Sequence, residues 1–180
     1  DPSDYTFKET TFDRAAAQAA TDGLPPWAAN FVATDTELHL TAYYLETVQV
    51  ILESVSEEMR YTLLTMEEDD KCTPIHMACM QENSEVLEMM MRLITVEETR
   101  YELLKLPDVW GYTPLHWSAE RDHTQHIKVI AVSVTSQRLI HLLRQTNNEG
   151  QTPLQWAAER KKQAAVELQK DCETKALTWT

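Results

Sequence analysis

Three residues with metal-binding or redox chemistry, Cys72, His76 and Cys79, lie within eight positions of one another. Thiolate and imidazole groups are ligands that zinc accepts, and a structural zinc site needs four ligands, usually as two pairs. The sequence offers no obvious second pair nearby. A metal or redox protein built on these three residues is therefore the less favoured hypothesis, and we expect no metal and no cofactor.

The same residues make a poor nucleophilic site. Cys79 follows His76 by three positions in a stretch that reads as a helix interior, where burial raises the pKa of a thiol and keeps it unreactive. The chain also lacks a Gly-rich phosphate loop, a Gly-x-Ser-x-Gly elbow and a His-Glu-x-x-His zinc motif. We therefore predict that the protein is not an enzyme.

Composition narrows the class of protein further. The 180 residues are 43% hydrophobic and 25% charged, with 3 Gly and 7 Pro, which favours a folded, helical chain over a turn-rich β fold. The formal net charge of −13 disfavours binding to nucleic acids or to anionic membranes and favours a basic partner. No apolar run is long enough to span a bilayer, so we expect no membrane insertion.

The three cysteines are an odd number without a dense framework, which indicates free thiols in a reducing compartment. The sequence begins at Asp1 without a Met. We therefore expect a cytoplasmic protein, or the intracellular portion of a larger one.

A seven-residue motif recurs along the chain. Thr-Pro-Ile-His-Met-Ala-Cys begins at Thr73, and related copies begin at Thr113, Thr152 and, more weakly, Thr36. The four threonines are separated by 37, 40 and 39 positions. Leu-Leu pairs at 63–64, 103–104 and 142–143 each end 9 positions before the next threonine. Two features that keep the same register indicate a repeat protein.

Each repeat reads as a set of short helices. Thr is a good N-cap, and the Pro that follows it suits the first helical position. An apolar helix comes next, and then a short third helix within 56–64, 95–104 or 135–143. The sequence Thr95-Val96-Glu97-Glu98 predicts a capping box in which Thr95 caps the third helix and Glu98 reaches back to it.

Thr-Pro-Leu-His-x-Ala is the signature of ankyrin repeats, and the chain resembles that family over residues 34–170. The resemblance implies an all-α, ankyrin-type helical solenoid of four units, at about 34–70, 71–110, 111–149 and 150–170. Residues 1–33 would form an N-terminal capping segment with one helix, and 171–180 a C-terminal tail. The units are longer than the usual 33 residues, and Glu82, Asp122 and Lys161 replace the Gly that usually separates the paired helices.

The resemblance also gives the recurring histidines a role. His39, His76 and His116 would bond backbone and Thr groups between adjacent turns, with Gln155 replacing the imidazole in the last unit. His123, His126 and His141 lie outside this position and are predicted to be more exposed.

Ankyrin domains bind other proteins through their turn tips and the exposed side of each first helix, which together form a concave face. Carried onto this chain, that pattern predicts a partner-binding set spread over the last three units. The set is Asp69, Asp70, Trp110, Tyr112, Trp117, Glu120, Arg121, Asn148, Gln151, Trp156, Glu159 and Arg160.

Two alternatives concern these residues. Trp117 and Trp156 could instead pack between neighbouring first helices, whereas Trp110 at a tip favours partner contact. The acidic run 67–70 could dock a basic segment or stay solvated. A further open question is whether the inserted third helices form a second binding face, for which the residues to watch are Arg60, Tyr61, Arg100 and Tyr101.

We therefore favour a protein–protein interaction module that is monomeric or weakly self-associating. The alternative is a structural spacer or self-association segment of a larger receptor, channel or scaffold protein.

Overall fold

A computed structural model describes residues 45–178 of the chain. The predicted capping segment 1–33, the first threonine motif at Thr36 and His39 lie outside the described residues. Within the described part, ten helices and no strands confirm the predicted all-α repeat fold. The helices are α4 (Leu45–Ser54), α5 (Glu57–Leu64), α6 (Pro74–Met80), α7 (Glu85–Leu93), α8 (Glu97–Leu104), α9 (Pro114–Glu120), α10 (Thr124–Ser133), α11 (Ser136–Arg144), α12 (Pro153–Glu159) and α13 (Gln163–Thr178).

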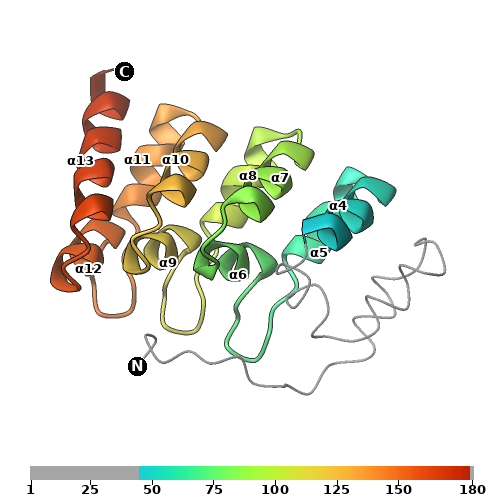
Figure 1. Ribbon diagram of the computed structural model, residues 1–180, viewed down its shortest axis with the longest axis horizontal. Coiled ribbons are helices and arrows are strands. Elements are labelled where there is room, and N and C mark those ends of the chain that lie inside the picture. Colours follow the sequence, from blue (N-terminus) through green and yellow to red (C-terminus); the bar gives the residue numbers. More distant parts are fainter. Residues whose placement is uncertain (1–44, 179–180) are drawn as a thin grey trace.

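The helices form three rows along a stack of units, and the loops between units hang from one edge (Figure 1). The first helices α6, α9 and α12 pack on one another, as do the second helices α4, α7, α10 and α13. The third helices α5, α8 and α11 confirm the predicted insertion after each second helix. In the last unit no separate third helix occurs within the described residues, and the long α13 packs on α11 instead.

The Thr-Pro motif starts every first helix by the same local chemistry. Thr73, Thr113 and Thr152 are N-caps with extended backbone, and a Pro occupies the following position. A capping box with the residue three positions later completes each start. Pro favours a helical φ, and the N–H that it lacks would have no intrahelical acceptor at the first position, so it begins the helix at no cost in hydrogen bonds.

The core is continuous from unit to unit because each unit contributes the same buried positions. The Leu-Leu pairs are almost wholly excluded from solvent, with Leu64 and Leu104 at 0% exposure and Leu143 at 6%. Burying each such side chain contributes about 1.5–3 kcal/mol to folding. The stack therefore depends on neighbouring units to cover one another's apolar sides.

The C-terminal helix runs further than the sequence pattern suggested. We expected the fourth unit to end near 170 and a tail to follow, whereas α13 continues to Thr178. No helix of the described part is both long and apolar enough to cross a membrane.

Candidate functional site: the turn tips and the first-helix face

The tips of the three described loops are joined by backbone hydrogen bonds. The Val109 N–H donates to the Asp70 carbonyl at 3.0 Å, and the Asn148 N–H donates to the Trp110 carbonyl at 3.0 Å. The Asn148 side chain adds a bond from Nδ2 to the Val109 carbonyl at 2.9 Å. The loops therefore present one connected row of tips rather than three independent segments.

Two of the three tips are shaped by a carboxylate or amide at the base of the loop. Asp108 Oδ1 accepts from the backbone N–H groups of Trp110 and Tyr112 at 2.9 and 2.8 Å. Asn147 Oδ1 accepts from Glu149 and Gln151 in the same pattern, at 3.0 and 2.9 Å. Short polar side chains are suited to such turns because they bond the backbone a few residues further on. These bonds therefore hold the backbone of the two tips in one conformation.

Both glycines of the tips, Gly111 and Gly150, have left-handed backbone, and the first of them is also closely approached by the neighbouring tip. Gly111 has a φ of 82° and a Cβ there would lie 2.7 Å from the Asn148 backbone nitrogen. Gly is needed at such a position, because the close approach of the neighbouring tip leaves no room for a side chain.

The recurring histidines connect each first helix to the next tip, as the resemblance implied. His76 Nδ1 accepts from the Thr73 N–H at 3.1 Å, and His116 Nδ1 accepts from the Thr113 N–H at the same distance. Nε2 of each ring therefore carries the hydrogen and donates to the next loop, to the Tyr112 carbonyl at 3.1 Å and the Gln151 carbonyl at 3.0 Å. Burial lowers the pKa of His116 to about 4, so its imidazole is neutral at pH 7.

In the last unit an amide takes the histidine's place. Gln155 Oε1 accepts from the Thr152 N–H at 2.8 Å, which is the bond that the imidazole makes elsewhere. The predicted replacement of His by Gln is confirmed at this position.

The aromatic residues of the predicted set lie behind the tips. Tyr112, Trp117 and Trp156 are exposed by only 4%, 1% and 5%. The Tyr112 ring lies between the two indoles, with centroid distances of 5.6 Å to Trp117 and 4.9 Å to Trp156. Trp117 and Trp156 therefore pack between neighbouring first helices, which was the alternative to partner contact. Tyr112 is buried with them. These rings support the face rather than form its outer surface.

Asp108 connects the aromatic cluster to the tip. Its Oδ2 accepts from Trp117 Nε1 at 2.9 Å, while Oδ1 holds the tip backbone. Burial raises the pKa of Asp108 to about 6, although the N–H donors of Tyr112, Trp117 and Trp110 act in the opposite direction. Removal from water outweighs these donors because a carboxylate loses more solvation than three N–H groups return.

The remaining residues of the predicted set are accessible, with one exception. Asp69, Asn148 and Glu159 are exposed, Asp70, Trp110, Arg121, Gln151 and Arg160 are partly exposed, and Glu120 is buried at 7% exposure.

Three contacts order the accessible residues on the first-helix face. The Arg160 guanidinium lies 4.3 Å from the centroid of the Trp156 ring. Arg121 forms an ion pair with Glu120, with 3.2 Å between Nε and Oε2. Gln151 Nε2 donates to the Glu159 carboxylate. The accessible face therefore combines acidic tips with partly ordered cations at the C-terminal ends of α9 and α12.

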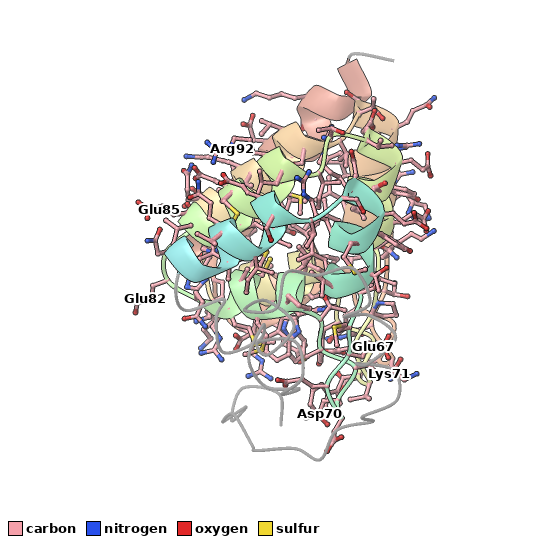
Figure 2. The ribbon with its side chains drawn as sticks, turned by 90° about the vertical axis from the view of Figure 1, so that its right-hand side faces the viewer. Glu67, Asp70, Lys71, Glu82, Glu85 and Arg92 are labelled. Carbon is pink, nitrogen blue, oxygen red and sulfur yellow. The ribbon has the colours of Figure 1, made fainter. Side chains whose placement is uncertain are left out.

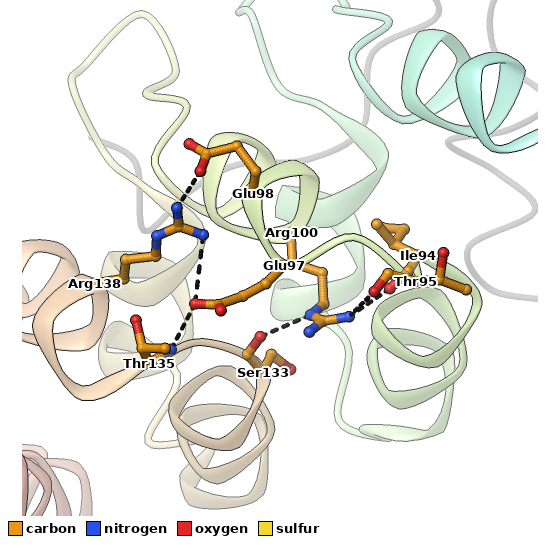
Figure 3. Close-up of polar contacts among 8 residues, drawn as sticks. All are labelled: Ile94, Thr95, Glu97, Glu98, Arg100, Ser133, Thr135 and Arg138. Carbon is orange, nitrogen blue, oxygen red and sulfur yellow. Dashed lines mark hydrogen bonds and ion pairs between the residues drawn. The ribbon is translucent and has the colours of Figure 1, made fainter.

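The third helices carry a second set of contacts between units, which sequence reasoning missed. Glu57 Oε1 accepts from the backbone N–H groups of Thr95 and Val96, both at 2.9 Å. Glu97 repeats the contact in the next unit and accepts from the Thr135 N–H at 2.8 Å. Each carboxylate thus bonds the backbone at the start of the third helix of the following unit, and Figure 3 shows the contact from Glu97 to Thr135.

Two arginines follow the same register. Arg60 donates to the Leu52 and Leu93 carbonyls, and Arg100 donates to Ser133 and Ile94 at 2.7 and 2.6 Å (Figure 3). The repeated pattern Glu-x-x-Arg, at 57–60 and 97–100, is the sequence signal that could have revealed this ladder.

The capping box predicted at Thr95 and Glu98 is wrong. Val96 is the N-cap of α8, and the Thr95 hydroxyl donates to Glu57 of the preceding unit. Glu98 bonds Arg138 of the following unit instead of reaching back (Figure 3). The carboxylate of Glu57 accepts from the Thr95 N–H, which is the donor that Glu98 would need for a capping box.

The cysteines and histidines that could do chemistry are built into the core. Cys72 and Cys79 are fully buried, and burial raises the pKa of the Cys79 thiol to about 12. His76 already bonds on both ring nitrogens. Among residues 45–178, no group of three His, Cys, Asp or Glu side chains is arranged to hold a metal ion.

The expectation that His126 is exposed is wrong, since its exposure is 1%. It stacks on His123 with 4.9 Å between ring centroids. His126 follows Thr113 by 13 positions, as the buried Val86 follows Thr73, so the repeat register accounts for its burial.

Comparison with known proteins agrees with the repeated helices and Thr-Pro starts. A model of the family described as ankyrin repeats (3 copies) matches residues 38–138 and 101–176. A search of curated proteins found no match to the chain. The family match extends over more than half of the chain and includes every described first helix. The chain therefore belongs to the ankyrin-repeat family.

Proposed function

We propose that the protein binds a partner protein through its row of turn tips and the exposed side of its first helices. Ankyrin repeats generally act as protein–protein interaction modules and are typically not enzymes. The observation that carries the proposal is the hydrogen-bonded row formed by Asp70, Val109, Trp110 and Asn148. A surface whose backbone is already ordered loses little conformational entropy on binding.

The charge of the tips indicates the chemistry of the partner. Glu67, Asp69 and Glu149 are exposed carboxylates on neighbouring tips, and Asp70 is partly exposed beside them. The whole chain has a formal net charge of −13. A basic segment on the partner would therefore be attracted to this edge, and the attraction would weaken at high salt.

An apolar element lies within the acidic row. Val109 is 38% exposed at its tip, and Trp110 is half-buried beside it. Apolar and aromatic groups surrounded by polar ones are typical of the energetic centre of an interface. We propose that Val109 and Trp110 contact the partner directly, while buried Trp117, Tyr112 and Trp156 hold them in position.

The proposal concerns a partner inside the cell. No two of Cys72, Cys79 and Cys172 form a disulfide in the structure. Free thiols persist in a reducing compartment.

The test is affinity capture from cell lysate with three versions of the chain. The first is the wild type, and the second is the tip variant Asp69→Lys/Glu149→Lys. The third is a control variant, Glu58→Lys/Glu85→Lys, which makes the same change in charge on α5 and α7, away from the tips. All four substituted residues are exposed, so circular dichroism should be unchanged in both variants.

We expect the control to retain a partner that the tip variant loses. Equal retention by both variants would place the contact elsewhere on the molecule. Capture of nothing by any version, together with concentration-dependent association in light scattering, would favour the alternative of a spacer or self-association segment.

A further inference from the structure

A groove lies between two second helices, α7 and α10, with α8 at its end. Its volume is about 450 Å³. Buried Met91 and Val129 contribute its apolar lining, and Val132 stands at the groove with 84% of its surface exposed. A valine so exposed on an ordered helix offers apolar surface that a bound molecule would remove from water.

The charged residues of this groove are mainly cationic, in contrast to the acidic chain. Arg92, Arg100 and Lys128 line it, with Glu88 as the acidic residue of the lining. Glu88 is held by Ser84, whose hydroxyl donates to Oε1 at 2.8 Å. Within residues 45–178 the ion pairs involve other cations, so none of these three residues is paired directly with a carboxylate, although the charge of Arg100 attracts that of Glu97.

One of the three cations is fixed in place. Arg100 donates from Nε to the Ser133 carbonyl at 2.7 Å and from Nη1 to the Ile94 carbonyl at 2.6 Å. Its positive charge is therefore positioned at the groove by the same bonds that connect the units. Arg92 and Lys128 are exposed and can adjust to a ligand.

We propose that this groove binds an acidic peptide segment of a partner protein, with a large apolar side chain of the peptide packed against Val132. A carboxylate on such a peptide would meet Arg92, Lys128 and the fixed charge of Arg100. Arg and Lys favour carboxylate ligands through charge-assisted hydrogen bonds. A small free anion would leave the apolar lining of the groove exposed to water, whereas an apolar side chain of a peptide would cover it.

This surface is separate from the turn tips. Figure 2 shows Arg92 on the upper left of the molecule, whereas Glu67, Asp70 and Lys71 lie at its lower right. The two surfaces also select opposite charges, because the tips attract a basic segment and the groove an acidic one. The chain would therefore bind two segments at once, on different sides of the stack.

The experiment is selection of random twelve-residue peptides displayed on phage against the complete chain, with counter-selection against Lys128→Glu. A selected peptide is then synthesised with a fluorescent label, and its affinity is measured by fluorescence anisotropy. The variants are Lys128→Glu, Val132→Ser and the control Lys170→Glu, which makes the same charge change at an exposed position of α13. The three positions are exposed, so the variants should fold as the wild type does.

We expect the selected peptides to be rich in Asp and Glu and to contain Leu, Ile or Phe. Affinity should fall at least about tenfold in Lys128→Glu and about fivefold in Val132→Ser, and stay unchanged in Lys170→Glu. Selected peptides without excess acidic residues, or equal loss of affinity in Lys128→Glu and Lys170→Glu, would overturn the proposal. Dimerisation of the chain that Lys128→Glu abolishes would also overturn it, because a second copy would then be the occupant.

Discussion

Three residues other than glycine have left-handed backbone in the described part of the chain, and one of them, Asp122, uses its side chain in a hydrogen bond between units. Lys71, Asp122 and Lys161 have φ values of 56°, 61° and 58°. Lys71 stands at the position of Gly111 and Gly150, and Asp122 and Lys161 stand where ankyrin repeats usually carry Gly. Left-handed backbone is costly for a residue with a Cβ. Asp122 offsets this cost because its Oδ1 accepts from the Ala165 N–H at 2.7 Å.

Replacing Lys71 or Lys161 by Gly should stabilise the protein. Relief of the backbone strain exceeds the extra entropy of Gly in the unfolded chain, so the free energy of unfolding should rise by about 1 kcal/mol for each change. Urea titration followed by circular dichroism measures it. Asp122→Gly is the matched control and should bring no gain, because it loses the bond to Ala165; a lower midpoint for Lys71→Gly would refute the strain argument.

Asp108 should make stability depend on pH in an unusual direction. Its pKa is raised to about 6 in the folded protein from 3.8, so the folded state holds this proton more tightly than the unfolded state does. The stabilising contribution is present below pH 3.8 and is lost as pH rises through 6. Relative to Asp108→Asn, the free energy of unfolding should therefore fall between pH 4 and pH 6 and stay level above.

The measurement is urea unfolding of both proteins across that range, with the Asp108 carboxyl followed by NMR. Asp108→Asn also loses the bond from Trp117 Nε1 at every pH, so the slope of the difference is the informative quantity. Hydrogen bonds from Thr95 and Thr135 hold the pKa values of Glu57 and Glu97 below the usual 4.5. These two carboxyls therefore change their protonation at lower pH than Asp108 does. A difference between wild type and Asp108→Asn that rises from pH 4 to pH 6 would contradict the assignment.

At the scale of the helices, the sequence predicted the local starts correctly and missed the contacts between units. The Thr-Pro motif specifies its own cap within four residues, so α6, α9 and α12 could be predicted without tertiary structure. The third helices could be predicted from their length and Leu pairs. Their caps could not, because Glu57 reaches Thr95 from 38 positions away. The predicted box at Thr95 failed for that reason.

Removal of the Glu97 carboxylate should loosen the start of α11. The Thr135 N–H would lose its acceptor, and amide hydrogen exchange at Thr135 should become faster in Glu97→Ala. Glu97→Gln keeps an acceptor oxygen and should retain most of the protection. Exchange that is equally fast in Glu97→Gln and Glu97→Ala would show that the ion pair with Arg138 matters more than the cap.

At the scale of the whole molecule, the repeat register predicted the stack but not which aromatic residues reach its surface. Tyr112, Trp117 and Trp156 carry the residue types of an interface, yet the close spacing of adjacent units buries all three. Exposure depends on how neighbouring units approach, which the motif alone does not specify. The tips are different, since turn residues outside the helices stay at the surface and are predictable from sequence.

Site-specific photocrosslinking shows whether a partner protein contacts the row of tips. A photoreactive residue is placed at Asp69, Val109 or Asn148 in turn, and at Glu58 or Glu102 on the third helices as controls, and the captured proteins are identified. We expect one protein to be crosslinked from all three tip positions and from neither control. Crosslinks that form only from Glu58 or Glu102 would contradict it and would move the binding surface to the third helices.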